Sequence, residues 1–277
     1  MKHYFVCSTF IATKANLQLR YFIKLAYNGT AYHGWQYQPN ASSVQEVLNK
    51  GLSVILNSPI SIMGAGRTDT GVHASQMYAH FDYEGSIDST QLVHKLNSYL
   101  PKDITIYDVF LVHEEAHARF DASARTYEYH IHTFKDPFLQ EQSWYFHQNL
   151  DVDLMNEASK LLFNHTNFQS FSKVNTDVNT FDCTIYAAYW TRGRTNNNQA
   201  QPENNNLVFT ISANRFLRNM VRSIVGTLVN VGLGKITIAD FNAIIESKNR
   251  DKAGFSVPAH GLYLTKIDYP FLTVKED

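Results

Sequence analysis

Apolar residues along the chain recur with two periods, which together predict strands interleaved with helices. The alternating pattern typical of strands covers residues 20–27, 104–112, 127–133, 183–191, 207–213 and 261–268. Helical spacing covers about residues 44–56, 90–100 and 217–231, and a shorter helix ends near residue 247. Because both halves of the chain mix the two element types, the pattern favours an α+β fold made of two similar units side by side.

Capping residues mark the starts of two predicted helices, and a proline marks the end of a third. Ser43 and Glu46 have the spacing of a capping box, and Thr237 with Asp240 predicts the start of the last helix. Pro101 ends the helix that precedes it.

The length of 277 residues fits about two compact units. We predict an N-terminal extension over residues 1–19, a first α/β half over residues 20–125 and a second over residues 126–277. Residues 193–206 are rich in Asn, Gln and Gly with little to bury, so they are predicted to form a mobile hairpin tip between two strands.

Charge and cysteine content narrow the class of protein. The 24 Lys and Arg residues nearly balance the 25 Asp and Glu residues, so any binding of nucleic acid must come from local basic clusters. Cys7 and Cys183 do not form a metal-binding pair, which favours a reduced cytoplasmic protein without a disulfide or zinc framework. No run approaches the roughly 18 apolar residues of a membrane span, and polar residues interrupt the first 19 positions, so no signal peptide is expected.

The candidate chemistry centres on the loop Gly64-Ala-Gly-Arg-Thr-Asp-Thr-Gly-Val-His-Ala74, which places one acid, Asp69, between an arginine and a glycine. Apolar residues enter this loop at 60–62 and leave it at 77–81, which predicts a tight connection between buried segments. Its glycines let the backbone approach a ligand closely. Asp69 could act as a nucleophile there, or it could bond to its own backbone in an ordinary turn.

A stripe of arginines is predicted on the helix of residues 217–231. Arg215 lies near its start, and Arg218 and Arg222 are four residues apart, so the last two project from one face. The stripe could aim cations into a cleft or form a solvated face. Apolar neighbours should draw Arg222 toward the interior, where it needs an anion, and Asp69 is the candidate partner.

Aromatic residues provide candidate stacking surfaces for an extruded base. Tyr127 and Tyr129 lie on the same side of a predicted strand beside Arg125. Two core tyrosines would give the same pattern. The loop sequence His33-Gly-Trp-Gln36 allows the same two interpretations.

Two short motifs resemble other kinds of site but lack the required context. His113-Glu-Glu-Ala-His117 matches a zinc pattern that needs both histidines on one helical face, yet it follows a predicted strand. Asp69-Thr-Gly71 is similar to the aspartic protease motif, in which two carboxylates share one proton. Since the chain has no second copy, a protease would need a symmetric dimer.

Several motifs in a fixed order resemble the tRNA pseudouridine synthase A family over about residues 20–268. They are Tyr27-Asn-Gly-Thr-Ala-Tyr-His-Gly-Trp-Gln36, Gly66-Arg-Thr-Asp-Thr-Gly-Val-His-Ala74, Arg119-Phe-Asp-Ala122, Ala124-Arg-Thr-Tyr-Glu-Tyr129, Phe216-Leu-Arg-Asn-Met-Val-Arg222, Val225-Gly-Thr-Leu228, Gly232-Leu-Gly-Lys235 and Ala259-His-Gly-Leu-Tyr-Leu264. The combination is specific, whereas the Asp69 loop alone is not. One departure is Gly254-Phe255, where the family more often has Gly-Pro.

The resemblance implies the pseudouridine synthase fold, with two ferredoxin-like halves, a central mostly antiparallel sheet and a catalytic cleft between the halves. It also implies an isomerase that acts as a cytoplasmic homodimer without a metal or cofactor. The implied substrate is uridine in the anticodon stem-loop of tRNA, at tRNA positions 38, 39 and 40.

The resemblance also implies roles for individual residues. Asp69 is the implied catalytic nucleophile, Tyr127 packs against the target base and can relay a proton, and Arg222 pairs with Asp69. The implied substrate-binding residues are Arg67, which helps to turn the base out, Arg125, Arg215, Arg218, His73 and Leu262. Attack of Asp69 on the sugar and removal of a sugar proton by Asp69 are both compatible with the sequence.

Two other classes of protein fit parts of the pattern. A tRNA-binding module without catalysis would keep its contacts through Arg215 and Arg218 and tolerate the loss of Asp69. An aspartic hydrolase would cleave peptides at acid pH and ignore RNA.

Overall fold

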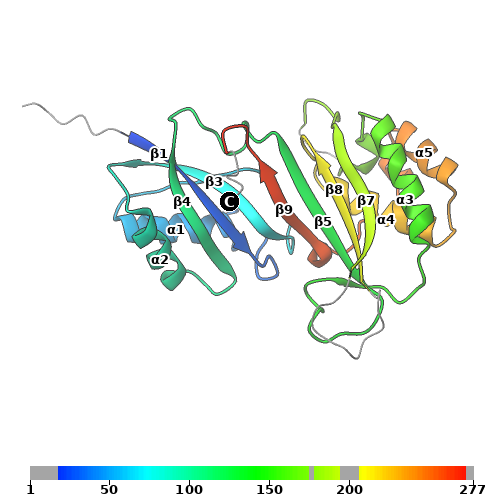
Figure 1. Ribbon diagram of the computed structural model, residues 1–277, viewed down its shortest axis with the longest axis horizontal. Helices are drawn as coiled ribbons and strands as arrows, with labels where there is room; N and C mark the ends of the chain where they lie inside the picture. The colour runs from blue at the N-terminus through cyan, green and yellow to red at the C-terminus, as the bar shows by residue number, and fades with distance from the viewer. Residues whose placement is uncertain (1–17, 175–177, 194–205, 273–277) are drawn as a thin grey trace, which may run out of the picture.

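The computed structural model describes residues 18–174, 178–193 and 206–272, and within these ranges nine strands form one continuous sheet (Figure 1). The predicted extension up to residue 17 and the predicted hairpin tip over residues 194–205 lie outside them. The strands are β1 (Gln18–Tyr27), β2 (Met63–Gly64), β3 (His73–Glu84), β4 (Ile104–Val112), β5 (Ala124–His132), β6 (Trp144–Tyr145), β7 (Ile185–Gly193), β8 (Asn206–Ala213) and β9 (Leu262–Asp268). Along the sheet the order is β4-β1-β3-β9-β5-β8-β7, with β2 paired to β3 and β6 to β5.

Each half of the sheet repeats one strand order. In the first half the neighbours are β4, β1, β3 and β2, and every pair is antiparallel. In the second half β9, β5, β8 and β7 are arranged in the same way. When the strands of each half are numbered by their order in the chain, they lie side by side as fourth, first, third and second. This is the ferredoxin-like arrangement. The predicted α+β fold with two ferredoxin-like halves is confirmed.

The two halves join where β3 and β9 pair in parallel, with His73 opposite Tyr263 and Ala74 opposite Leu264. His73 is the first residue of β3, so the Asp69 loop enters the sheet at this joint. Residues 113–123 connect β4 to β5, and the boundary predicted between residues 125 and 126 falls inside β5.

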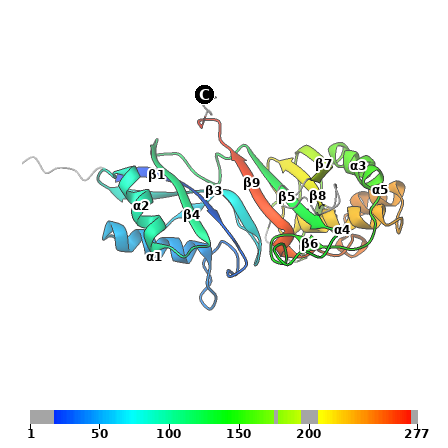
Figure 2. The same cartoon turned by 60° about the horizontal axis from the view of Figure 1, so that its bottom comes forward.

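The described helices form two groups at opposite ends of the long axis, with β3, β9 and β5 between them (Figures 1 and 2). They are α1 (Val44–Leu56), α2 (Ser89–Tyr99), α3 (Val152–Lys160), α4 (Met220–Gly232) and α5 (Ile238–Glu246). Helix α2 contacts β4, whereas α3 contacts β7 and α4. In the described part of the chain, no helix has the length and apolar character needed to span a membrane.

Side chains cap the helices largely as predicted. The Ser43 hydroxyl accepts a hydrogen bond from the Glu46 N–H at the start of α1, and Thr237 with Asp240 forms a complete capping box at α5. Helix α3 was not predicted, because its buried face is short and includes the small residues Ala158 and Ser159. Its start is capped by the Asp151 carboxylate, which accepts two backbone N–H bonds.

Helix α4 begins at Met220, three residues later than the predicted start at Leu217. Asn219 precedes it in the left-handed conformation, with φ of 68°. The backbone therefore turns sharply just before the helix. As a result Arg218 lies in the turn and Arg222 in the first helical turn, so the two do not form the predicted stripe along one helix face.

Each half has its own apolar core. Phe22, Leu48 and Phe81 are fully buried in the first, and Phe209 and Leu228 in the second. Full burial of such a side chain stabilises the folded state by roughly 1.5–3 kcal/mol. Tyr127 is half-buried and packs against both cores, which places it at the seam between the halves.

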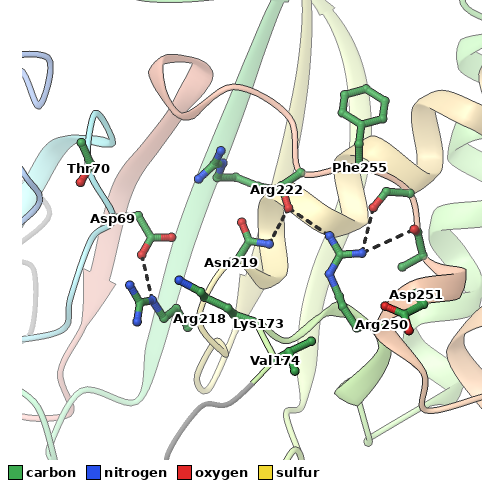
Figure 3. Close-up of a pocket in the computed structure, with 13 residues that line it drawn as sticks. Asp69, Thr70, Lys173, Val174, Arg218, Asn219, Arg222, Arg250, Asp251 and Phe255 are labelled. Atoms are coloured by element: carbon green, nitrogen blue, oxygen red, sulfur yellow. Dashed lines mark hydrogen bonds and ion pairs between the residues drawn. The ribbon is translucent and has the colours of Figure 1, made fainter.

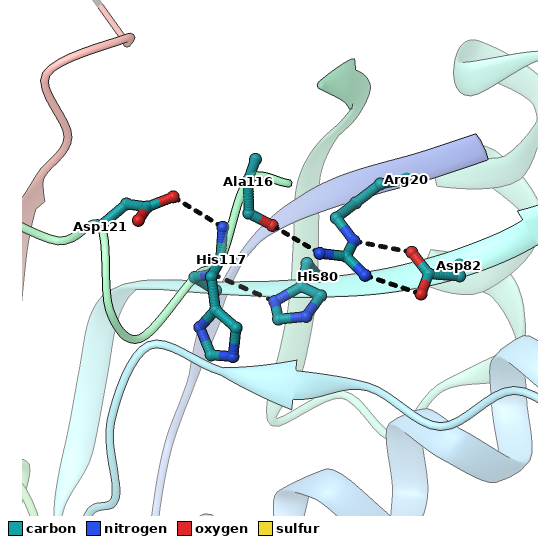
Figure 4. A network of polar contacts seen from close by, with 7 residues as sticks. Arg20, His80, Asp82, Ala116, His117 and Asp121 are labelled. Atoms are coloured by element: carbon teal, nitrogen blue, oxygen red, sulfur yellow. Dashed lines mark hydrogen bonds and ion pairs between the residues drawn. The ribbon is translucent and has the colours of Figure 1, made fainter. Parts of the chain in front are cut away.

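Polar contacts hold the connection between β4 and β5 (Figure 4). The Arg20 guanidinium donates two hydrogen bonds to Asp82, at 2.7 and 2.9 Å, and a third to the carbonyl oxygen of Ala116 at 3.1 Å. The backbone N–H of Ala118 donates to Nδ1 of His80 at 3.1 Å. These bonds tie this irregular loop to β1 and β3.

The segment His113–His117 is part of this loop and not a helix. Its histidines therefore do not share a helical face, which agrees with the rejection of the zinc pattern on its context. His117 instead accepts hydrogen bonds at Nδ1 from the backbone N–H groups of Arg119 and Phe120.

We expect His80 to make stability depend on pH. Burial lowers the pKa of His80 from 6.5 to about 4, so below pH 6.5 the unfolded chain binds a proton that the folded protein does not. Stability should therefore be lost as the pH falls from 6.5 toward 4. The variant His80→Asn keeps an acceptor for Ala118 and cannot titrate, so its melting temperature should fall less between pH 7 and pH 5. Thermal denaturation at both pH values, with wild type alongside, measures this; equal losses in the two proteins would contradict it.

Candidate active site

An open pocket of about 660 Å³ lies where the Asp69 loop of the first half faces the start of α4 (Figure 3). Asp69 and Thr70 form one side, and Arg218, Asn219 and Arg222 form the other. The remaining described lining residues are Lys173, Val174, Arg250, Asp251, Ala253, Gly254, Phe255 and Ser256. Among the described lining residues, four basic side chains accompany two acidic ones. The local charge is therefore positive although the whole chain is nearly neutral.

The backbone of the Asp69 loop is held by residues 32–35. Trp35 donates its backbone N–H to the carbonyl oxygen of Thr68 at 3.3 Å, and the Gly71 N–H donates to the carbonyl oxygen of Tyr32 at 3.3 Å. Within the loop, the carbonyl oxygen of Asp69 accepts from the Val72 N–H at 3.1 Å. These bonds fix both sides of Asp69 while its side chain stays available.

Two glycines allow the close approach of these segments. Gly34 has φ of 88°, and a Cβ there would overlap the carbonyl oxygen of Thr68. A Cβ at Gly29 would overlap the carbonyl oxygen of Val72. Only glycine fits at either position without moving the Asp69 loop.

Trp35 supports the loop from the core. Its side chain is 2% exposed and packs against Gly64, where any Cβ would overlap the indole ring. Of the two interpretations of His33-Gly-Trp-Gln36, the structure therefore supports a core role for the tryptophan. Tyr27 packs beside it, and the Tyr27 hydroxyl shares a buried 2.8 Å hydrogen bond with the hydroxyl of Thr68.

The Asp69 carboxylate faces Arg218, with 3.6 Å between Asp69 Oδ1 and Arg218 Nε. Arg222 donates its Nε–H to the carbonyl oxygen of Val257 at 2.6 Å. The predicted Asp69–Arg222 pair is not formed between these two described residues, because the turn at Asn219 puts Arg218 nearer to the loop. The Asp69 side chain is 30% exposed and that of Arg218 59%, so the pair contributes about 1 kcal/mol or less.

The contact of the Asp69 side chain also tests the alternative that Asp69 belongs to an ordinary turn. In such a turn the carboxylate bonds to a nearby backbone N–H. Here the contact of the side chain is the guanidinium of Arg218, across the seam between the halves. A partly exposed carboxylate oriented by a cation is available to a ligand in the pocket.

Tyr127 lies within electrostatic reach of Asp69. Burial raises the pKa of Tyr127 to about 12, and the negative charge of Asp69 adds to the rise while Arg125 opposes it. The phenol is therefore neutral at physiological pH. Its ring meets the ring of Phe216 edge to face at 5.1 Å. Tyr129, by contrast, is fully buried and donates its hydroxyl to the carbonyl oxygen of Pro258 at 2.9 Å, so it is a core residue.

Two of the predicted substrate-binding residues are buried away from the pocket. His73 accepts the Gly29 N–H at Nδ1 and contacts the carbonyl oxygen of His260 through Nε2, both at 3.0 Å, so its two ring nitrogens are occupied. Burial lowers the pKa of His73, which favours the neutral ring. Leu262 is 6% exposed within the second core. Substrate contacts from these two side chains do not fit the structure.

The predicted arginines differ in their surroundings. Arg67 is exposed and forms no hydrogen bond or ion pair within the described part of the chain. Arg215 is half-buried and donates to the carbonyl oxygen of Thr180 at 3.4 Å. The guanidinium of Arg125 donates to four backbone carbonyl groups, so the predicted substrate contact from Arg125 does not fit.

The sequence did not identify Lys173 and Arg250 as members of the site. Arg250 donates to the carbonyl oxygen of Gly254 at 3.0 Å and to the hydroxyl of Ser256 at 3.1 Å. Lys173 donates its backbone N–H to the carbonyl oxygen of Arg218 at 3.0 Å. Lys173 lies in a loop and Arg250 begins a 3-10 helix of three residues. Neither segment has a periodic pattern, so only the positive charges could have drawn attention to them.

Comparisons with known proteins agree with this fold. The family model of the tRNA pseudouridine synthases matches residues 24–121 and 158–270. The tRNA pseudouridine synthase A of Bacteroides fragilis is 53% identical over 252 residues, covering 91% of this chain and 96% of the relative. That of Bacteroides thetaiotaomicron is 52% identical over 251 residues, covering 91% of each chain. That of Thermoanaerobacter sp. is 39% identical over 254 residues, covering 89% of this chain and 98% of the relative.

The chain belongs to the tRNA pseudouridine synthase family, whose members are isomerases. The predicted family is thereby confirmed. The match spans both ferredoxin-like halves and includes both sides of the pocket.

We expect Gly34→Ala to damage the site. The added Cβ must push the Thr68 carbonyl away, which should destabilise the protein by about 1–3 kcal/mol and lower its activity, because Asp69 follows Thr68. Gly66→Ala is the matched control for stability, since a Cβ there meets nothing within 4 Å. Chemical denaturation and an isomerase assay measure both effects. Equal stability of the two variants would contradict the close packing at Gly34.

Proposed function

We propose that this protein converts uridine to pseudouridine in the anticodon stem-loop of tRNA, with Asp69 as the catalytic residue. The supporting observation is the position of Asp69, a partly exposed carboxylate at the mouth of a basic pocket, paired with Arg218 across the seam. The family membership and the printed names of the relatives support the reaction and the substrate class.

The reaction breaks the bond between C1′ of the ribose and N1 of uracil, turns the base and joins C1′ to C5. The hydrogen on C5 leaves as a proton, and N1 gains one, so the product is an isomer of the substrate. A carboxylate can assist by attack at C1′ or by removal of a sugar proton, and both options need Asp69 near the ribose. Arg218 would orient the carboxylate and balance its charge.

Tyr127 is proposed to hold the detached base and to relay a proton. With a pKa of about 12, removal of the phenol proton of Tyr127 at pH 7 costs roughly 7 kcal/mol. A phenolate that waits to take the C5 proton is therefore disfavoured. A neutral hydroxyl can still accept that proton while passing its own to a neighbouring acceptor.

Binding of tRNA is proposed to depend on the basic pocket and on neighbouring arginines. Turning a base out of the stem costs a few kcal/mol, which contacts to phosphates must offset. Arg67 is exposed beside Asp69, which suits the proposed role of helping to turn the base out. Arg215 is the proposed phosphate ligand near α4, whereas Arg218 is proposed to hold the carboxylate of Asp69. We also propose a cytoplasmic homodimer, for which the family resemblance is the support.

We expect Asp69→Asn to abolish turnover while fold and tRNA affinity are kept. The amide preserves the shape of the side chain and removes its charge, so release of tritium from C5-labelled uridine in an anticodon stem-loop should fall roughly a thousandfold or more. The assay is run on wild type and variant side by side, with tRNA binding measured by filter retention.

Appreciable release by Asp69→Asn would contradict the catalytic role of Asp69. Tight binding of tRNA without release by wild type would instead support a non-catalytic binding module. Cleavage of a peptide at acid pH by wild type would support a hydrolase.

We expect Arg218 and Arg222 to have separable effects. Arg218→Gln removes the cation at Asp69, so the turnover number should fall by at least about tenfold, or about 1.4 kcal/mol, with little change in melting temperature. Arg222→Gln disturbs the bond to Val257, so it should lower the melting temperature more. Steady-state kinetics and thermal denaturation of both variants measure this. A larger loss of turnover in Arg222→Gln than in Arg218→Gln would restore the pairing expected from the sequence.

A further inference from the structure

One guanidinium group, that of Arg125, binds three separate segments of the chain. Its Nη1 donates to the carbonyl oxygens of Ala122 at 3.0 Å and Asn214 at 2.9 Å. Its Nη2 donates to those of Ala65 at 3.0 Å and Arg119 at 2.7 Å. A guanidinium has five N–H donors, four of them on Nη1 and Nη2. The two terminal nitrogens are therefore fully occupied by backbone.

The segments that Arg125 holds are those that carry the site. Ala65 lies four residues before Asp69 in its loop, and Asn214 lies four residues before Arg218 in the connection from β8 to α4. The Arg125 side chain therefore fixes the backbone from which both Asp69 and Arg218 extend. Arg125 itself is near the start of β5, two residues from Tyr127 and on the same side of that strand.

We propose that Arg125 is a positioning residue that sets the geometry between Asp69 and Arg218 and does not bind the phosphates of tRNA. The proposal rests on the catalytic role proposed for Asp69. Binding of a phosphate by arginine uses two parallel N–H groups. Since four donors of Arg125 are taken by carbonyls and the side chain is half-buried, no such pair is left to face RNA.

The test is Arg125→Lys, which keeps the charge. An ammonium group has three donors at one point and cannot span four carbonyls on three segments. We expect the turnover number for tritium release to fall at least about tenfold. The dissociation constant for tRNA and its dependence on salt should match those of wild type, because no phosphate contact is lost.

Arg20→Lys is the matched control. Arg20 is also a half-buried arginine, and it holds the same connection between β4 and β5 through Ala116, but its other partner is Asp82, away from the pocket (Figure 4). This variant should lower the melting temperature and leave the turnover number unchanged at temperatures well below melting. If Arg125→Lys is unfolded at the assay temperature, Arg125→Gln is measured at a lower temperature by the same criteria.

Two results would overturn the proposal. Weaker tRNA binding by the Arg125 variant, with a salt dependence reduced by about one phosphate contact, would make Arg125 an RNA ligand. A lower melting temperature with full turnover, as in Arg20→Lys, would make it a support of the fold alone. Asp69→Asn in the same assay separates the two hypotheses, because activity in that variant contradicts the role of Asp69 whatever Arg125→Lys shows.

Discussion

The site depends on the short parallel pairing of β3 with β9. This pairing covers His73 and Ala74, and it joins two ferredoxin-like halves. Beside it, β9 of the second half also places Leu264 and Ile267 in the core of the first half. His73 strengthens the joint, because its ring bonds to Gly29 of the first half and to His260 of the second. A charged imidazole could not accept the Gly29 N–H at Nδ1. Burial lowers the pKa of His73, which keeps the ring neutral and so preserves this bond.

Sequence periodicity was sufficient to predict most of the fold. The predicted strands correspond to β1, β4, β5, β7, β8 and β9, and the capped helices to α1 and α5, with small differences at their ends. Each of these elements carries a continuous apolar face, and that face is what periodicity detects. Helix α3 also has a buried face, but the face is only nine residues long and includes Ala158 and Ser159, so its apolar signal in the sequence is weak.

The sequence predicted several residues of the site but not how they are arranged. Asp69 and Arg218 do meet at one pocket, yet the choice of Arg218 over Arg222 depends on the left-handed backbone of Asn219, which helical spacing cannot reveal. The family resemblance implied that His73 and Arg125 contact the substrate. Both instead bind backbone groups from segments distant in sequence, and no local pattern encodes such partners.

The place of β9 in the chain has a consequence for biosynthesis. It is the last described strand, yet it lies in the middle of the sheet between β3 and β5. Strands β1 to β4 can pair with one another as soon as they leave the ribosome, since domains generally fold as units in the order of synthesis. The edge of β3 must wait for β9 until the rest of the chain has been made. A nascent chain therefore carries Asp69 long before it has an active site.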